Sequence, residues 1–366
     1  MYLPHKAGEP PYTRREISEI EGACKAMNRR RLEDVAIAMV TPGKGILAMD
    51  ESNPTCKRRF DSIGVEANEE SRRAYRELLI TAEGSSEYLS GYILFDETIR
   101  QATLDGQTFP EIIASAGGIP GIKVDKGTLD MPGHSGEKFT QGLDGLGERL
   151  NEYRELGAGF AKWRAVITIG EGVPSTACIE ANMRSLAVYA SICQDIGIVP
   201  IVEPEVLIDG DHNIETCDAV TRTTLRSLYR ALAEQDVFIE GTILKPSMVV
   251  SGKDCPQQAG VDEVAERTIA CLKNSVPAAN PGVVFLSGGQ TAVQSTVHLN
   301  AMNATGVNVP WRLSFSYGRA LQEPALKAWA GDAENAALAQ AALALRARLN
   351  GAATLGEYKP EMEKSA

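Results

Sequence analysis

Eight short apolar runs recur along the chain, and each is followed by polar residues. Their hydrophobicity is continuous rather than alternating, which is typical of strands buried on both faces, as in a parallel sheet. The runs are GILAMD (45–50), GYILF (91–95), GIKVD (121–125), AKWRAVI (161–167), VPIVEPE (199–205), FIEGTILKP (238–246), GVVFLSG (282–288) and RLSFSYG (312–318).

Helix-like stretches separate these runs. They include residues 68–82, 175–197, 213–235 and 262–276. Asn68 is a good N-cap for the first of them, because its side chain can accept a hydrogen bond from the first turn. Eight strands alternating with helices predict an α/β protein built as a single (β/α)8 TIM barrel.

The two ends of the chain extend this barrel. Residues 1–44 precede the first strand and form a charged, helix-prone extension, and residues 332–350 form an Ala/Leu-rich helix. We expect the barrel domain, with both helical segments, to span 1–350. Residues 351–366 are expected to form a flexible C-terminal tail.

The charge balance excludes one class of partner. The 366 residues include 37 Lys and Arg against 48 Asp and Glu, for a formal net charge of −11. Such an acidic chain is poorly suited to bind a nucleic-acid backbone. The basic run Arg29–Arg31 is followed by Glu33 and Asp34, which is typical of a solvated helix face. An anionic ligand must therefore meet a local cluster of cations.

Cysteine and histidine spacing argues against a disulfide framework or a metal centre. The seven cysteines are scattered without a CxxC pair, and the four histidines have no metal-ligand spacing. The N-terminus lacks the apolar core of a secretory signal, and no apolar run is long enough to span a membrane. We expect a soluble cytoplasmic protein that uses no metal and no cofactor and does not associate with a membrane.

Charged and small polar residues gather where the predicted strands end. Lysines inside core strands would be costly unless paired, so we expect them to converge on a polar pocket at the carboxyl ends of the strands. The other interpretation is a buried salt-bridge lattice filling the barrel, although barrel interiors usually hold branched aliphatic residues. The residues are Asp50, Glu51, Ser52, Lys123, Lys126, Lys162, Arg164, Glu203, Glu205, Lys245, Ser287, Gly288, Gly289, Ser316, Gly318 and Arg319.

Two groups of these residues suit anions. Gly288 and Gly289 free backbone N–H groups after the seventh strand, and Arg319 follows the eighth, where barrels often bind phosphate. Ser52, Lys123 and Arg164 form a possible second anion site across the mouth of the barrel. The substrate is therefore expected to be anionic at both ends.

Lys245 is the predicted nucleophile. A lysine shielded from water beside another cation, here Lys162, loses its proton more readily and can attack a carbonyl carbon. The protonated imine that results withdraws electrons from adjacent carbons, which permits carbon–carbon cleavage without a metal. Glu203, Glu205 and Asp50 can supply the proton transfers.

Nine motifs occur in order along the chain: GKGILAMDES (43–52), GIKVDKG (121–127), QGLDGL (141–146), FAKWR (160–164), IVPIVEPE (198–205), DGDH (209–212), LKP (244–246), FLSGGQ (285–290) and FSYGRALQ (315–322). They closely resemble those of class I fructose-bisphosphate aldolase, from about residue 40 to about residue 350. The resemblance implies a (β/α)8 barrel that reversibly cleaves fructose 1,6-bisphosphate to dihydroxyacetone phosphate and glyceraldehyde 3-phosphate, in glycolysis and gluconeogenesis. AMDESNPTC (48–56) is more similar to plastid and bacterial members, which suggests carbon fixation as well.

The resemblance also implies a role for each matching residue. Lys245 matches the Schiff-base lysine and Glu203 the main acid/base, while Asp50 and Lys162, supported by Glu205, orient and polarise the substrate. It further implies a homotetramer. The phosphate-binding residues on the dihydroxyacetone side are Ser287, Gly288, Gly289, Ser316, Gly318 and Arg319. The residues matching the other phosphate site are Ser52, Lys123 and Arg164, and Arg59 matches a substrate-contacting arginine.

Departures from the family pattern and alternative functions remain. Family members commonly end in a tyrosine that assists proton exchange, whereas the last tyrosine here is Tyr358, and Thr55 replaces a usual serine. One alternative is a related Schiff-base aldolase that prefers sedoheptulose 1,7-bisphosphate. Another is a non-catalytic role in binding filaments or other proteins, against which the intact Lys245, Glu203 and Asp50 argue.

Overall fold

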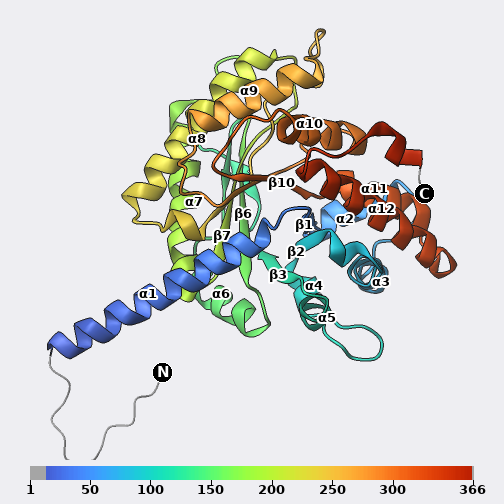
Figure 1. Ribbon diagram of the computed structural model, residues 1–366, viewed down its shortest axis with the longest axis horizontal. Helices are drawn as coiled ribbons and strands as arrows, with labels where there is room; N and C mark the ends of the chain where they lie inside the picture. The colour runs from blue at the N-terminus through green and yellow to red at the C-terminus, as the bar shows by residue number, and fades with distance from the viewer. Residues whose placement is uncertain (1–13, 365–366) are drawn as a thin grey trace, which may run out of the picture.

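The computed structural model describes residues 14–364, with side chains from residue 22 onward; residues 1–13 of the expected extension and 365–366 of the expected tail lie outside it. Its main sheet is a closed parallel barrel with the strand order β1-β10-β9-β8-β7-β6-β3-β2 (Figure 1). This confirms the predicted (β/α)8 fold. The barrel strands are β1 (Gly45–Ala48), β2 (Leu89–Leu94), β3 (Ile119–Lys123), β6 (Phe160–Ile167), β7 (Val199–Val206), β8 (Ile243–Leu244), β9 (Gly282–Phe285) and β10 (Arg312–Tyr317).

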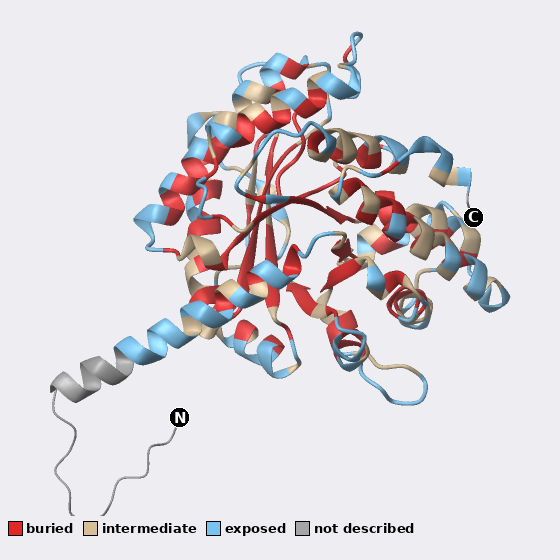
Figure 2. Cartoon of the chain, in the orientation of Figure 1, coloured by how far each residue is buried: buried red, intermediate tan, exposed pale blue. Residues whose placement is uncertain are grey.

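The strands are buried along most of their length, which explains their continuous apolar runs (Figure 2). The predicted run 238–246 is an exception, because only Ile243–Leu244 is a strand and Ile239–Gly241 forms a 3-10 turn. The side-chain amide of Gln194 donates to the carbonyl oxygens of Phe238 (2.7 Å) and Gly241 (3.2 Å). These carbonyls therefore bond to helix α7 instead of extending the strand.

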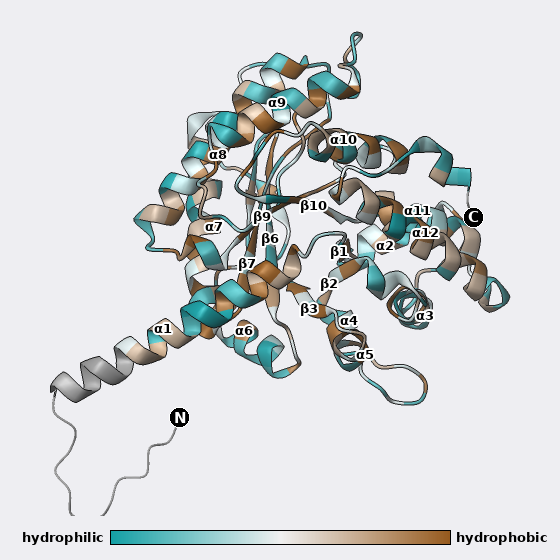
Figure 3. Ribbon diagram, viewed as in Figure 1, coloured by the Kyte–Doolittle hydropathy of each residue, from teal (hydrophilic) through white to brown (hydrophobic). Residues whose placement is uncertain are grey.

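Helices surround the barrel, with hydrophobic residues concentrated along the strands that they cover (Figure 3). As predicted, Asn68 caps the start of α3, where it forms a capping box with Ser71. Gly197 ends α7 in the left-handed conformation. None of the helices within 14–364 combines the length and apolarity that crossing a membrane requires. The helices are α2 (Asn53–Asp61), α3 (Glu69–Ile80), α4 (Asp96–Ile99), α5 (Phe109–Ser115), α6 (Leu146–Glu155), α7 (Thr176–Ile196), α8 (Ile214–Glu234), α9 (Val261–Lys273), α10 (Ala292–Ala304), α11 (Arg319–Trp329) and α12 (Ala336–Thr354).

The N-terminal helix α1 (Arg14–Met39) closes one end of the barrel with its second half. Its buried residues Leu32, Ala36 and Met39 share an apolar cluster with strand residues inside the barrel. The first half of α1 runs away from the barrel (Figure 1). The strand residues of this cluster are Ile46, Ala48, Ile93, Phe160, Val199, Ile201, Ile243 and Val284.

The C-terminal segment differs from the expectation. Helix α12 spans Ala336–Thr354 rather than 332–350, after a 3-10 turn at Ala333–Asn335. Gly351 therefore lies inside the helix and does not end it. A Cβ at this position would be 2.6 Å from the carbonyl oxygen of Gly43, so the glycine permits a close approach of the two backbones.

The expectation of a flexible tail from residue 351 also needs correction. A second 3-10 turn, Pro360–Lys364, follows α12. Its Glu363 accepts hydrogen bonds from the buried Arg346 guanidinium at 2.6 and 2.7 Å and from the Tyr358 hydroxyl at 3.0 Å. Because Tyr358 is itself buried, the described part of the tail packs onto the barrel domain.

A two-stranded antiparallel hairpin, β4 (Thr128–Asp130) and β5 (Lys138–Thr140), was not predicted. Its strands are too short to show an alternating pattern. The buried carboxylate of Glu137 joins the hairpin to α7 by accepting from both the backbone N–H and the hydroxyl of Ser175, at 2.6 Å each.

Candidate active site

The polar residues predicted from the strand ends meet in one cavity at the carboxyl end of the barrel. The cavity has a volume of about 1580 Å³. Every residue predicted for catalysis or phosphate binding lines it. These residues are Asp50, Ser52, Arg59, Lys123, Lys162, Arg164, Glu203, Glu205, Lys245, Ser287, Gly288, Gly289, Ser316, Gly318 and Arg319.

The charged cluster occupies only one end of the barrel. The layer beneath it is the apolar cluster that α1 closes, which contains Phe160, Ile201 and Ile243. The charged residues line an open cavity instead of filling the barrel as a salt-bridge lattice. The pocket interpretation is therefore the correct one.

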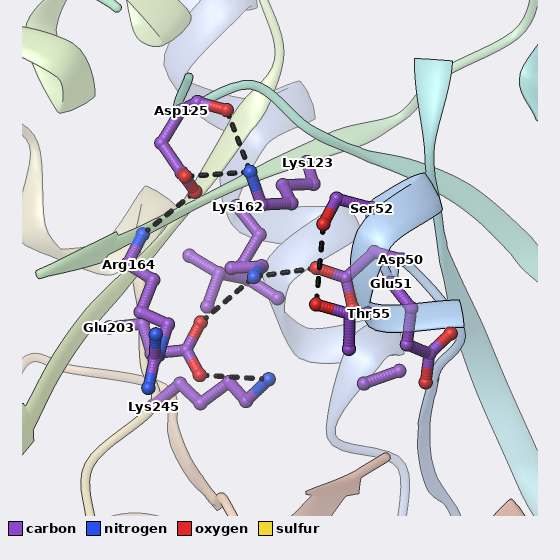
Figure 4. A network of polar contacts seen from close by, with 12 residues as sticks. Asp50, Glu51, Ser52, Thr55, Lys123, Asp125, Lys162, Arg164, Glu203 and Lys245 are labelled. Atoms are coloured by element: carbon purple, nitrogen blue, oxygen red, sulfur yellow. Dashed lines mark hydrogen bonds and ion pairs between the residues drawn. The ribbon is translucent and has the colours of Figure 1, made fainter. Parts of the chain in front are cut away.

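Two lysines share one carboxylate at the centre of the cavity (Figure 4). Glu203 of β7 lies with Oε1 3.2 Å from Lys245 Nζ and with Oε2 3.2 Å from Lys162 Nζ. Lys162 Nζ also lies 2.6 Å from Oδ2 of Asp50, which follows β1. The sequence predicted that Lys162 acts on Lys245 as a neighbouring cation, whereas in the structure the Glu203 carboxylate contacts both amines.

The electrostatics fix the charge states of Asp50 and Lys162. Burial alone raises the pKa of Asp50, but the ammonium groups of Lys162 and Lys245 outweigh it and hold that pKa well below its usual range. Burial likewise lowers the pKa of Lys162, but the carboxylates of Asp50 and Glu203 outweigh it and raise that pKa. Lys162 is therefore a permanent ammonium at neutral pH, unsuited to nucleophilic attack.

Arg164 and Lys123 lie beside this centre, each with its own carboxylate. Arg164 Nε pairs with Glu205. Burial alone lowers the pKa of Arg164, but the Glu205 carboxylate outweighs burial, so the pKa is raised. Lys123 Nζ donates to Asp125 Oδ1 (2.6 Å) and to the Asp125 carbonyl oxygen (2.7 Å). Asp125 also accepts from the backbone N–H of Arg164 at 3.3 Å, so it links the two cations.

The loop after β9 has the geometry of an anion-binding turn. Gly288 and Gly289 both have positive φ, +52° and +90°, which favours glycine. A Cβ on Gly289 would lie 3.5 Å from Nη2 of Arg319, so the guanidinium is adjacent to the turn. Ser316 Oγ is buried and has no hydrogen-bond partner within the described residues. A phosphate would satisfy these donors.

The opposite side of the cavity is formed by α2 and the residues before it. Ser52 Oγ donates to Thr55 Oγ1 at 3.3 Å, so the threonine hydroxyl lies next to the predicted second phosphate site. Arg59 pairs with the buried Glu51, and its Nη2 would lie 3.8 Å from a Cβ on Gly318. Arg59 thus lies between the two predicted phosphate sites.

Two carboxylates hold cations in place in a way that the sequence did not predict: Asp125 was not among the predicted pocket residues, and Glu51 was among them but without an arginine partner. Asp125 binds Lys123, and Glu51 binds Arg59 together with the fully buried Arg76, whose Nη1 lies 2.5 Å away. Both are adjacent in sequence to predicted site residues. This proximity in the sequence is the feature from which their place at the site could have been predicted.

Among residues 14–364, no group of three or more His, Cys, Asp and Glu side chains is arranged to hold a metal ion.

Comparisons with known proteins converge on one family. The family model described as "Glycolytic: Fructose-bisphosphate aldolase class-I" matches residues 31–366. The chain is 60% identical over 334 residues to a "Probable fructose-bisphosphate aldolase class 1" of Xanthomonas campestris pv. campestris, covering 91% of this chain and 100% of that protein. It is 55% identical to "Fructose-bisphosphate aldolase 5, cytosolic" of Arabidopsis thaliana, covering 87% and 89% of the two chains.

A solved structure that this chain resembles has the same fold. It is the fructose-bisphosphate aldolase from Plasmodium falciparum in a ternary co-crystal with TRAP and a small-molecule inhibitor. The TM-score is 0.90 at 47% sequence identity, covering 91% of this chain and 96% of that chain.

Proposed function

The chain belongs to the class I fructose-bisphosphate aldolase family, and we propose that Lys245 is the residue that forms the imine with the substrate. The enzyme cleaves fructose 1,6-bisphosphate reversibly to dihydroxyacetone phosphate and glyceraldehyde 3-phosphate. The observation that supports Lys245 is the 3.2 Å contact of its Nζ with Glu203, a carboxylate able to move protons at the reacting amine. Lys162 has a second carboxylate partner, Asp50, that keeps it protonated.

The reaction begins with the Lys245 amine. The Lys245 lone pair attacks the ketone carbon to form a carbinolamine, whose hydroxyl takes a proton and leaves as water to give the protonated imine. A base removes the proton from the hydroxyl on C4, which is the carbon of the C3–C4 bond to be cut that lies farther from the imine. The carbon–carbon bond then breaks, the aldehyde leaves, and the electron pair remains as an enamine on Lys245. Protonation of the enamine carbon and hydrolysis release dihydroxyacetone phosphate.

Glu203 and Asp50 have different roles in these steps. A carboxylate whose pKa is strongly lowered is a weak base, so Asp50 is better suited to orient a substrate hydroxyl than to remove its proton. Glu203 lies against Lys245 and is our candidate for the proton transfers at the carbinolamine and the imine. Lys162 polarises the substrate oxygens, and Glu205 supports it by holding Arg164.

The two phosphates are assigned to opposite sides of the cavity. Ser287, Gly288, Gly289, Ser316, Gly318 and Arg319 bind the phosphate on the dihydroxyacetone side. Ser52, Lys123 and Arg164 bind the other phosphate, with Arg59 between the two sites. The adjacency of Arg319 to the Gly289 turn supports the first assignment.

Assembly and location are proposals from relatedness. We propose a homotetramer, as is usual in the family, and a cytoplasmic location, as in the plant relative named cytosolic. Sedimentation velocity of the purified chain tests the first. A sedimenting species of one or two chains would contradict it.

Reductive trapping tests the assignment of Lys245. The protein is incubated with dihydroxyacetone phosphate and borohydride, digested, and mapped by mass spectrometry. We expect the label on Lys245 alone. Lys245→Met is the control, because it keeps a similar apolar stem without an amine, and it should fold, bind the bisphosphate and show neither label nor cleavage. Label on Lys162 or Lys123 in the wild type would show that another lysine is the nucleophile.

A further inference from the structure

The turn after β9 is closed by a residue that lies just beyond it. The backbone N–H of Gln290 donates to the carbonyl oxygen of Ser287 at 2.9 Å, with Gly288 and Gly289 as the two central residues. Gln290 is 8% exposed, so its side-chain amide must find partners inside the protein. Helix α10 begins directly afterwards, with Thr291 as its N-cap.

The partner of this amide is a histidine two turns along α10. His298 Nδ1 lies 2.6 Å from Oε1 of Gln290. Burial lowers the pKa of His298 to about 4, so the ring is neutral near pH 7 and carries one hydrogen. Because an amide oxygen only accepts, that hydrogen is on Nδ1. The hydrogen bond therefore fixes which end of the Gln290 amide faces α10.

The other end of the amide connects the turn to the segment that carries Lys245. Gln290 Nε2 donates to the sulfur of Met248 at 3.6 Å, and Met248 is fully buried three residues after Lys245. A second link is the hydrogen bond from the Leu286 backbone N–H to the carbonyl oxygen of Pro246, at 3.1 Å. Gln290 thus joins α10, the glycine turn and the loop after β8.

We propose that Gln290 and His298 are positioning residues that hold the Gly288–Gly289 turn in the orientation that binds the substrate phosphate. This inference rests on the proposed function, because it takes this turn as the phosphate site on the dihydroxyacetone side. Neither side chain lines the cavity, so both act through the backbone of the turn. Without the hydrogen bond the amide rotates, and the donors of the turn no longer converge with Arg319 on one anion.

Two ligands that differ only in the phosphate test the inference. The half-saturating concentrations of dihydroxyacetone phosphate and of dihydroxyacetone are measured by borohydride trapping in the wild type, in His298→Phe and in Gln290→Leu. Loss of one hydrogen bond should raise the value for dihydroxyacetone phosphate about fivefold to tenfold in either variant. The value for dihydroxyacetone should not change, because it lacks the group that the turn binds.

Two further variants separate positioning from general damage. His298→Asn retains a donor near the place of Nδ1 and should behave like the wild type. Val293→Ala, at a site of the same helix that is 45% exposed, should also leave both values unchanged. Thermal melting identifies any variant that fails to fold, and either Gln290→Leu or His298→Phe alone suffices for the comparison.

The possible failures are distinguishable. If the wild type is not trapped at Lys245 by dihydroxyacetone phosphate, the proposed function fails. If it is trapped and the folded variants leave that half-saturating concentration unchanged, or raise it equally for both ligands, the positioning role is wrong. A His298→Asn variant with a raised half-saturating concentration of dihydroxyacetone phosphate would also contradict the positioning role.

Discussion

At the scale of single residues, the cations of the cavity differ in how firmly carboxylates hold them. Lys162 contacts Asp50 and Glu203, Lys123 contacts Asp125, and Arg164 contacts Glu205. Among the described residues, Arg319 has no carboxylate partner within 4.0 Å, and its guanidinium makes no hydrogen bond to another residue. Its charge is therefore available to a phosphate, which makes Arg319 the most informative residue for testing the phosphate site.

We expect Arg319→Lys to weaken substrate binding far more than it disturbs folding. A guanidinium binds a phosphate with two parallel N–H donors, and an ammonium cannot reproduce that geometry. The Michaelis constant for fructose 1,6-bisphosphate should rise about tenfold or more, which corresponds to about 1.4 kcal/mol or more of lost binding. Steady-state kinetics with thermal melting as the control measure both effects. An unchanged Michaelis constant at unchanged stability would place the phosphate elsewhere.

His298 should make the protein sensitive to mild acid. In the unfolded chain its imidazole titrates near 6.5, whereas in the folded protein burial lowers the pKa to about 4. Between these values the unfolded chain binds a proton that the folded chain does not, so stability falls as the pH falls. From pH 7 to 4.5, the free energy of unfolding of the wild type should drop about 2 kcal/mol more than that of His298→Asn.

Urea unfolding of both proteins at several pH values in this range measures the difference. The variant keeps a donor for Gln290 and loses only the titrating group. Parallel pH profiles would contradict the prediction, because they would mean that His298 titrates alike in the folded and unfolded chains.

The sequence predicted which residues reach the cavity but not how they pair. Catalytic positions at strand ends follow from the period of a strand, since Lys162 and Arg164 share a face, as do Glu203 and Glu205. The Gln290–His298 contact depends on how α10 leaves the turn, and no local pattern encodes it. For the same reason Glu203 was predicted as an acid or base, but not as the carboxylate between two lysines.

At the scale of elements, buried strands were predictable because they are apolar on both faces, and short or weakly patterned elements were not. The strand β8 is shorter than its apolar run because Gln194 binds the carbonyl oxygens before it. The β4–β5 hairpin has three residues in each strand, too few for periodicity. The glycine at position 351 looked like a helix end but instead permits contact with Gly43.

The packed C-terminal segment gives a prediction at this scale. Arg346 is buried, and its charge is balanced by Glu363, whose side chain is 26% exposed. Glu363→Ala removes that partner and leaves a buried guanidinium with only neutral acceptors, so the free energy of unfolding should fall by about 1–3 kcal/mol. Catalysis should change little, because neither residue lines the cavity. Urea unfolding and a cleavage assay measure the two effects.

A conservative variant serves as the control for this prediction. Glu363→Asp keeps the charge and should lose less stability than the alanine variant. Equal stability of Glu363→Ala and the wild type would mean that the segment after α12 contributes nothing to the fold, as the sequence first suggested.

At the scale of the whole molecule, the barrel divides into an apolar end and a charged end. Helix α1 closes the apolar end, which allows the other end to hold lysines and carboxylates without loss of the core. This division also reconciles a net charge of −11 with an anionic substrate. The excess of acidic residues is a property of the whole chain, whereas the cavity that binds the substrate is lined by the cations Lys123, Arg164 and Arg319.

The chemistry assigned to the charged end gives the last prediction, metal independence. Cleavage requires an acceptor for the electrons of the broken carbon–carbon bond. A metal ion provides one by polarising the carbonyl oxygen, whereas a protonated imine on Lys245 provides one through its nitrogen. If the imine is the acceptor, prolonged treatment with EDTA should leave the rate of fructose 1,6-bisphosphate cleavage unchanged. Lys245→Met should stay inactive in EDTA and with added zinc. A rate that EDTA abolishes and zinc restores would show that a metal, and not Lys245, accepts the electrons.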